Sequence, residues 1–308
     1  MRFLPEAESA ALVNEELAFT AVRSALIAAA EPQSSVFPAV ACHGSDPANR
    51  FTVKPGASAS LAGVKVGSYW PGNAAAGQPR HNSVVLLLDQ SVGRVEAVVE
   101  AGVVNAYRTA AADAVAASVL ARDDARTLAI FGTGHQALYE CLALARVRPV
   151  STILVVARSA TSGAEFLSRL AARGLTGTLA PAEEACAAAD IIVTATTATA
   201  PLFDAAWVRP GTHVASMGSD AAGKQELPPA LLTAARLFCD LPSQSVRIGE
   251  LQHVAALVAE GTLTVTAIGD VLAGRAPGRR SPDDITVFDS SGIALQDLFI
   301  AEALLRAG

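Results

Sequence analysis

The amino-acid sequence predicts an α/β protein of two domains, and three observations lead to that prediction. The chain has 308 residues, whereas a typical domain has about 100–200. After Arg122, apolar strands alternate with helices at the spacing of βαβ units, which predicts a parallel sheet covered on both faces. Before Arg122, short strands, a hairpin and helices of mixed order predict a separate α+β domain.

The elements of the first half follow from the spacing of apolar residues. A helix is expected over residues 11–30, where apolar side chains recur at helical intervals. Turn residues between two apolar runs predict a hairpin. The expected strands cover 51–53, 62–69, 83–88 and 94–99, and an alanine-rich helix covers 106–120.

The elements of the second half repeat one pattern, in which a short apolar strand is followed by a helix. The expected strands cover 127–131, 152–156, 191–195 and 213–217, with later short strands at 237–240 and 285–288. The expected helices cover 135–146, 162–173 and 293–306.

Composition excludes several classes of protein. Hydrophobic residues make up 51% of the chain and charged residues 17%, which excludes a disordered chain. No window holds about 18 consecutive apolar residues, so no transmembrane segment is expected. The first residues are rich in Glu and lack an apolar core, so no signal peptide is expected. A net charge of −6 without a basic tract argues against nucleic acid as a partner.

The cysteines and histidines indicate neither a disulfide framework nor a metal site. The four cysteines are far apart and form no CxxC pair. The histidines lack metal-ligand spacing, so no metal is expected. A reducing, cytoplasmic location is expected from this pattern of cysteines.

The clearest chemical signal is the segment Gly132-Thr133-Gly134-His135-Gln136-Ala137, which directly follows an apolar strand and opens a helix. The first glycine permits a tight turn, and the second lets a diphosphate approach the backbone. The alanine permits close packing of the helix. We therefore expect NAD(P) to bind at this turn; the alternative is a glycine turn in another kind of α/β protein.

The end of the second strand bears on the choice between NAD and NADP. Enzymes that use NAD usually place an acidic residue there, whereas this chain has Ala157, Arg158 and Ser159. The missing carboxylate removes a repulsion against a 2′-phosphate, and Arg158 can pair with one. Arg158 can equally stack on the adenine of NAD, so both cofactors remain open.

Four segments together resemble one protein family. They are AYRTAAADAVA (106–116), GTGHQA (132–137), PGTHVASMGSDAAGKQEL (210–227) and ITVFDSSGIALQDL (285–298). Their order and spacing resemble the ornithine cyclodeaminase/mu-crystallin family over residues 64–308. The sequence looks closest to the branch with archaeal alanine dehydrogenase and the imino acid reductases, including iminosuccinate reductase.

The resemblance implies a homodimer that binds NAD(P)H and a small imino or amino acid. It implies a Rossmann domain over residues 123–289. It further implies a substrate-binding and dimerisation domain built from residues 1–122 and 290–308.

The resemblance also implies roles for individual residues. Lys65 and Asp220 match the catalytic positions of the family. The substrate-binding positions correspond to Lys54, Lys65, Arg108 and Ser291. The cofactor-binding positions correspond to Ser83, Arg108, Thr109, Gly132, Gly134, His135, Gln136, Arg158, Thr196, Met217, Gly218 and Ser290. Glu226 is expected to be a structural partner or a solvated helix residue.

The chain departs from the family pattern at one substrate-binding position. Relatives carry an arginine where this sequence has Ser35, and half of the clamp for an ornithine carboxylate is therefore missing. Lys54 or Arg50 is expected to bind an anionic group placed elsewhere. A lysine beside an arginine gives a carboxylate two cationic donors, and an acid near the imine nitrogen favours the protonated iminium.

The function expected from these residues is the NAD(P)H-dependent reduction of a small 2-imino acid to an L-amino acid. Iminosuccinate and the imine of pyruvate are the candidate substrates. The alternatives are an ornithine cyclodeaminase, a cyclic ketimine reductase and a non-enzymatic protein that binds a cofactor or ligand. Ser290 and Ser291 lack the setting of a hydrolase nucleophile.

Overall fold

The computed structural model describes residues 1–308, which form two compact units. Unit 1 comprises Met1–Arg108 and Ile293–Gly308, and unit 2 comprises Thr109–Gly292. Helix α3 (Val104–Leu120) contains the point where unit 1 ends and unit 2 begins. None of the helices has the length and hydrophobicity needed to cross a bilayer.

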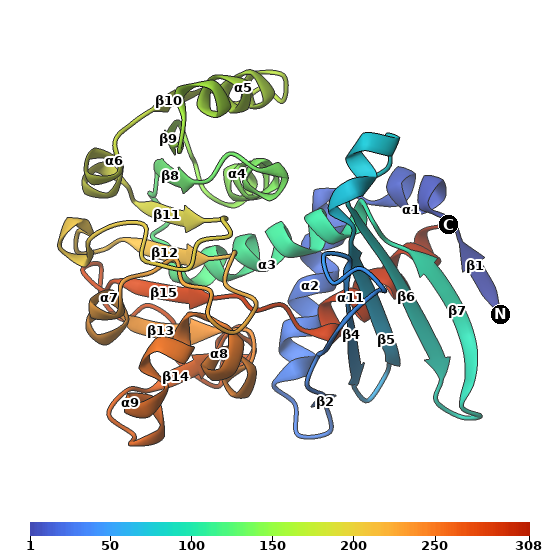
Figure 1. Ribbon diagram of the computed structural model, residues 1–308. Coiled ribbons are helices and arrows are strands. Elements are labelled where there is room, and N and C mark those ends of the chain that lie inside the picture. Colours follow the sequence, from blue (N-terminus) through green and yellow to red (C-terminus); the bar gives the residue numbers. More distant parts are fainter. The chain divides into compact units, whose positions relative to one another are not determined.

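Unit 1 is an α+β unit built on a seven-stranded sheet (Figure 1). Its main path runs β1-β7-β6-β5-β4-β2, and β3 pairs with β4. Its strands are β1 (Arg2–Leu4), β2 (Ser35–Val36), β3 (Val40–His43), β4 (Arg50–Ala57), β5 (Ala62–Tyr69), β6 (His81–Asp89) and β7 (Arg94–Glu100). Its helices are α1 (Glu6–Leu12), α2 (Glu15–Ala29), the 3₁₀ helix η1 (Pro71–Ala76) and α11 (Ala294–Ala307).

Helices α2 and α11 pack against each other, and α11 lies on β4, β5 and β6 (Figure 1). Two glycines let α11 approach closely. A Cβ atom on Gly63 would lie 2.2 Å from the Leu86 carbonyl oxygen and 3.0 Å from Leu298 Cδ2. A Cβ atom on Gly56 would lie 3.0 Å from Ala294 Cβ. Larger residues at these positions would push α11 off the sheet.

The helix expected over residues 11–30 corresponds to α2, which begins only at Glu15, because residues 11 and 12 belong to the end of α1. Val13 is extended and ends α1, and Asn14 then caps α2 by accepting the N–H of Leu17 at 2.9 Å. Asparagine is among the best N-cap residues, and here it outweighs the continuous apolar spacing. The expected strands and hairpin are present, although the strand expected over 51–53 extends over the whole of β4. Strands β1, β2 and β3 are too short for a periodic signal.

Unit 2 confirms the predicted α/β fold. Its sheet has eight strands in the order β10-β9-β8-β11-β12-β15-β13-β14, and all pairs are parallel. Its strands are β8 (Thr127–Phe131), β9 (Thr152–Val156), β10 (Gly177–Leu179), β11 (Ile191–Thr194), β12 (His213–Ser216), β13 (Arg236–Cys239), β14 (Val265–Ala267) and β15 (Thr286–Asp289).

The helices of unit 2 connect these strands. They are α4 (His135–Val147), α5 (Ala160–Ala171), α6 (Ala182–Ala188), α7 (Pro229–Ala234), α8 (Pro242–Ile248), α9 (Ala255–Ala259) and α10 (Ile268–Leu272), with the 3₁₀ helices η2 (Ala205–Trp207) and η3 (Glu250–Val254). Helices α6 to α10 have at most seven residues, so a period of 3.6 did not reveal them.

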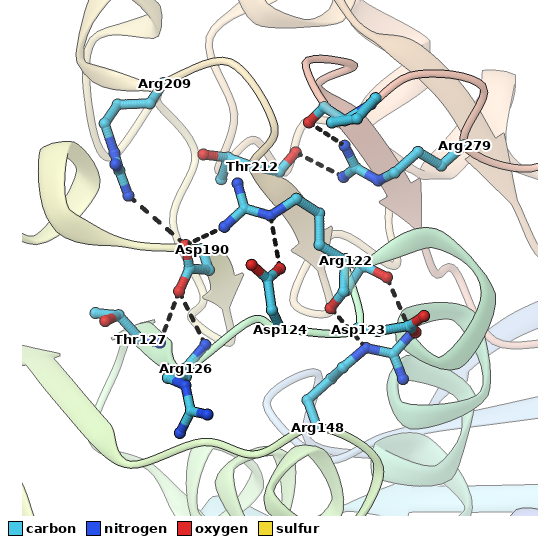
Figure 2. A network of polar contacts seen from close by, with 12 residues as sticks. Arg122, Asp123, Asp124, Arg126, Thr127, Arg148, Asp190, Arg209, Thr212 and Arg279 are labelled. Atoms are coloured by element: carbon cyan, nitrogen blue, oxygen red, sulfur yellow. Dashed lines mark hydrogen bonds and ion pairs between the residues drawn. The ribbon is translucent and has the colours of Figure 1, made fainter.

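A polar network closes the amino edge of the unit 2 sheet, where β8 and β11 begin (Figure 2). Asp190 accepts the N–H groups of Arg126 and Thr127 at 2.9 and 3.0 Å. Its carboxylate also lies 2.8 Å from the Arg122 guanidinium and 3.7 Å from that of Arg209. Asp190 thereby fixes the first residues of β8, and the network serves to hold the sheet together.

Replacing Asp190 with asparagine is expected to lower the free energy of unfolding at neutral pH by about 1–3 kcal/mol, because an amide cannot accept the same set of hydrogen bonds. Burial raises the pKa of Asp190, but the hydrogen bonds from Arg126 and Thr127 and the charge of Arg122 outweigh it and lower the pKa. The carboxylate therefore stabilises the fold above its unfolded pKa of about 4, and this contribution disappears as pH falls through the folded value.

Denaturation of the wild type and of Asp190→Asn at several pH values measures this difference. It should be constant near neutrality and shrink in acid. An unchanged difference at low pH would show that Asp190 acts by some means other than its charge.

Candidate active site

The carboxyl edge of the unit 2 sheet brings together most of the residues predicted to bind the cofactor. Gly132 follows β8 directly and adopts a φ of +117°, a conformation that favours glycine. A Cβ atom at Gly132 would lie 2.7 Å from the Ala195 carbonyl oxygen. Both the positive φ and the close approach of Ala195 therefore require glycine at this position, as the sequence motif predicted.

The start of helix α4 fits a diphosphate. Gly134 is the N-cap residue, and no side chain caps this helix. A Cβ atom on Gly134 would meet nothing within 4 Å, so the space over the first turn is open. The N–H groups of an uncapped helix start, together with its dipole, bind phosphate oxygens well.

The next two residues of the motif lie in the first turn of α4. His135 packs its ring against Tyr139, with ring centroids 4.9 Å apart. Burial and the nearby charge of Arg169 lower the pKa of His135, which favours the neutral ring. Gln136 donates to Glu140 Oε1 at 2.7 Å, so one end of its amide is held in place.

A cavity of about 220 Å³ lies at the carboxyl end of β9. It is open to solvent, and six of its seven lining residues have apolar side chains, which suits an adenosine group. The lining residues are Val155, Ala157, Ser159, Ala160, Leu179, Ala180 and Pro181. Arg158 is exposed, and Ser159 caps α5 by accepting the N–H of Ser162 at 3.2 Å. No carboxylate occupies residues 157–159.

The remaining cofactor positions of unit 2 follow β11, β12 and β15. Thr196 and Gly218 both donate their N–H groups to the buried carboxylate of Glu226, at 2.7 and 2.9 Å. The N–H of Met217 bonds the Thr194 carbonyl. Ser290 is nearly fully buried and donates its N–H to the Ser216 carbonyl.

Unit 1 holds a cluster of buried charges around one carboxylate. The Lys65 ammonium lies 2.9 Å from Asp297 Oδ1, and the Arg108 Nε lies 3.2 Å from the same oxygen. Both cations also donate to Asn105 Oδ1, at 2.6 Å from Lys65 and 2.8 Å from Arg108 Nη2. The exposed fractions of Lys65, Arg108 and Asp297 are 6%, 9% and 4%.

Lys54 is the third cation of this cluster. It lies directly opposite Lys65 in the β4–β5 pair, so the two side chains share one face of the sheet. Burial lowers the pKa of Lys65 to about 7, and the charges of Arg108 and Lys54 act in the same direction. Asp297 opposes them and raises it. Lys65 thus loses its proton far more readily than an ordinary lysine.

Asp297 and Asn105 are the members of this cluster that the sequence did not reveal. Asp297 occupies α11 among buried neighbours, between Gln296 and Leu298. A lone carboxylate on the apolar face of a helix needs a buried partner, and this signal was available in the sequence. Asn105 lies in the first turn of α3, and nothing in its neighbourhood marks it out.

The other predicted site residues lie elsewhere. Asp220 has a side chain that is 55% exposed, and it forms an ion pair with Lys224 at 2.5 Å. Ser291, expected to bind substrate, donates its hydroxyl to the buried Asp240 at 3.1 Å. Ser83 belongs to β6 of unit 1, and Thr109 is the first residue of unit 2.

Comparisons with known proteins identify similar chains. The sequence profile of the ornithine cyclodeaminase/mu-crystallin family matches residues 5–305. Iminosuccinate reductase from Paracoccus denitrificans is 38% identical over 99% of this chain and 96% of its own. The crystal structure of that organism's iminosuccinate reductase with NAD+ superimposes with a TM-score of 0.90 and 36% identity, covering 100% and 96% of the two chains.

An archaeal alanine dehydrogenase, solved as a dimer with bound NAD, is also similar. It superimposes with a TM-score of 0.91 and 30% identity, covering all of this chain and 95% of its own. These matches confirm the resemblance and the predicted fold, and both of the similar structures contain bound NAD.

Proposed function

The chain belongs to the ornithine cyclodeaminase/mu-crystallin family, and on that premise we propose that it reduces a small 2-imino acid to an L-amino acid with NAD(P)H. The nicotinamide supplies the hydride that reduces the C=N bond. Unit 2 holds the dinucleotide by Gly132, Gly134 and the start of α4. Unit 1 binds the carboxylate groups of the substrate through its cations.

The observation that supports a specific substrate is the charge of the unit 1 cluster. Three cations, Lys54, Lys65 and Arg108, interact with one carboxylate, that of Asp297. In this cluster the cations outnumber the carboxylate, so anionic groups of a substrate are attracted to it. A substrate with two carboxylates forms more of these charge-assisted contacts than one with a single carboxylate. We therefore propose iminosuccinate as the substrate and L-aspartate as the product.

The experiment compares oxaloacetate with pyruvate, each mixed with ammonia, which forms the imine in solution. Each turnover consumes one NAD(P)H and one proton and yields one amino acid, so absorbance of the reduced cofactor measures the rate. We expect kcat/KM to be at least tenfold higher with oxaloacetate. A preference for pyruvate would overturn the dicarboxylate assignment, and ammonia release from ornithine without net reduction would indicate a cyclodeaminase.

Two residues are proposed to handle protons. Lys65, with a pKa of about 7, can both pair with a carboxylate and exchange a proton near neutrality. Asp220 is proposed as the acid that favours the iminium form, with its carboxylate held by Lys224. Asp220→Asn should then lower kcat while leaving the dissociation constant of NADH unchanged.

We also propose a cytoplasmic homodimer. Its support is that the archaeal alanine dehydrogenase was solved as a dimer, and that unit 1 exposes the apolar side chains of Phe37, Val40 and Tyr69. The four thiols are all unpaired, as expected in a reducing compartment. Light scattering after size-exclusion chromatography measures the mass and tests the dimer.

Replacing Arg158 with aspartate is expected to shift cofactor preference toward NADH by about tenfold or more, because one charge-assisted contact to a 2′-phosphate is lost and a repulsion is added. The measurement is the ratio of the dissociation constants of NADPH and NADH. Replacing the distant, exposed Arg94 in the same way provides the control. An unchanged ratio in Arg158→Asp would exclude Arg158 from the 2′ position.

A further inference from the structure

Three fully buried carboxylates follow one another beneath the carboxyl edge of the unit 2 sheet. Asp289 Oδ1 accepts the N–H of Glu250 at 3.0 Å, and Glu250 Oε1 accepts the N–H of Glu226 at 2.7 Å. Glu226 Oε1 then accepts the N–H of Thr196, also at 2.7 Å. Each carboxylate therefore fixes the backbone of the residue that follows it in this series.

Glu226 has the largest number of contacts in the series. Its Oε1 accepts both the N–H and the hydroxyl of Thr196, each at 2.7 Å. Its Oε2 accepts the Thr194 hydroxyl at 2.8 Å, the Gly218 N–H at 2.9 Å and the Ser216 hydroxyl at 3.1 Å. These donors come from the ends of two neighbouring strands, β11 and β12. The Glu226 side chain therefore connects the loop after β11 with the loop after β12 through hydrogen bonds.

The backbone of Gly218 packs closely against the Glu226 carboxylate. A Cβ atom on Gly218 would lie 2.6 Å from Glu226 Oε1 and 2.3 Å from the Thr196 carbonyl oxygen. All donors to Glu226 are neutral, and burying a carboxylate costs several kcal/mol unless such bonds compensate it. The five donors compensate this burial and at the same time fix the strand ends that supply them. Strand ends at this edge are where α/β folds bind ligands.

The Thr196 hydroxyl acquires a defined orientation from this contact. Its proton is donated to Glu226, and one lone pair accepts the N–H of Ala198 at 3.1 Å. A hydroxyl oxygen has two lone pairs, so the second one remains to accept from a further donor. The carboxamide N–H of a nicotinamide is a donor of that kind.

We propose that Glu226 is a positioning residue for the reduction, fixing the Thr196 hydroxyl and the loops after β11 and β12 as a rigid support for the nicotinamide ring. This inference rests on the proposed function, since it takes Thr196 and Gly218 to lie beside that ring. Glu226 touches neither substrate nor cofactor and acts through these two residues.

The test is the variant Glu226→Gln, which keeps the volume of the side chain. Its amide nitrogen must face either the Thr196 N–H or the Gly218 N–H, so one donor is left without an acceptor. We expect kcat to fall about 10–100-fold, because small misplacements at a reacting centre have effects of that size. The dissociation constant of NADH should change less than about threefold, since the diphosphate and adenosine contacts of this fold lie elsewhere.

A second readout requires no turnover. The fluorescence anisotropy decay of bound NADH reports how far the nicotinamide moves on the enzyme. We expect faster depolarisation in Glu226→Gln than in the wild type. Thr196→Val, which removes the hydroxyl alone, should produce the same change, and the double variant should lose no more activity than the more impaired single variant.

Asp190→Asn is the matched control. Asp190 also accepts two backbone N–H groups in unit 2, but at the opposite edge of the sheet. It should lower stability while leaving kcat and the anisotropy decay at wild-type values. If Glu226→Gln behaves like Asp190→Asn, the inference is overturned and Glu226 is merely structural.

The outcomes also separate this inference from the proposed function. If the wild type binds NADH but reduces no imino acid, the reductase proposal fails and the anisotropy comparison still decides the role of Glu226. If the wild type binds no NADH, both are overturned. Should Glu226→Gln fail to fold, Thr196→Val provides the decisive anisotropy measurement, and wild-type behaviour in that variant would overturn the inference.

Discussion

Replacing Lys65 with methionine is expected to reduce kcat/KM for the imino acid by about thirtyfold to several thousandfold. Removing one partner of a buried, hydrogen-bonded charge pair costs about 2–5 kcal/mol, and each 1.4 kcal/mol is a factor of ten. Methionine has nearly the same length as the lysine stem, so the space between β5 and α11 stays filled. NADH binding should be unchanged, because the dinucleotide is proposed to bind unit 2.

The pH dependence of inhibitor binding is a second test of the role of Lys65. Because burial lowers the pKa of Lys65 to about 7, its charge is present below that pH and is lost above it. The inhibition constant of succinate, a dicarboxylate that cannot be reduced, should be lowest in the acidic range and rise above pH 7. Lys65→Arg keeps its charge throughout this range and should abolish the rise. A wild-type inhibition constant that is flat from pH 6 to 9 would remove Lys65 from the substrate site.

Replacing Asp297 with asparagine is expected to destabilise unit 1 by about 3–5 kcal/mol, the usual effect of breaking a buried ion pair by removing one partner. Burial raises the pKa of Asp297, but the charges of Lys65 and Arg108 outweigh it, and the pKa lies below the ordinary value. Without that carboxylate, two buried cations face each other and the pKa of Lys65 falls further. The variant should therefore lose substrate affinity at neutral pH as well as stability.

Tryptophan fluorescence can measure the stability of unit 1 separately from that of unit 2. Trp70 belongs to unit 1 and Trp207 to unit 2, so Trp207→Phe leaves a probe of unit 1 alone. In that background, Asp297→Asn should shift the denaturation midpoint of Trp70. At an acidic pH, where Lys65 still carries its charge, adding Lys65→Met should restore part of the loss, since it removes one of the uncompensated cations. A Trp70 transition unaffected by Asp297→Asn would contradict the assigned role of this carboxylate.

The sequence predicted those parts of the fold that depend on local patterns. Strands β5, β8 and β9 have the predicted bounds, because each is an apolar run long enough to show its period. The glycine turn after β8 was predictable because each small residue in it has its own steric reason. Strands β1 and β10 have three residues each, and they form only because a neighbouring strand provides hydrogen bonds.

The site was predicted only in part, because its contacts join segments that lie far apart in the sequence. Lys65 and Arg108 were assigned by resemblance, but the carboxylate that joins them belongs to α11, far along the chain. Glu226 was expected to be a structural partner or a solvated residue, and it is fully buried with five hydrogen-bond donors. Such roles depend on which distant segments meet, and periodicity carries no information about that.

Unit 1 is discontinuous, and this affects how the protein is made. Helix α11 is translated only after the whole of unit 2, although it covers strands that were translated before unit 2 began. During synthesis, the face of β4, β5 and β6 that α11 covers is therefore exposed to solvent. Lys65 and Arg108 then lack the carboxylate of Asp297, which belongs to α11. Nascent chains arrested before residue 293 should have a folded, protease-resistant unit 2 attached to a protease-sensitive unit 1 that requires chaperones to stay in solution.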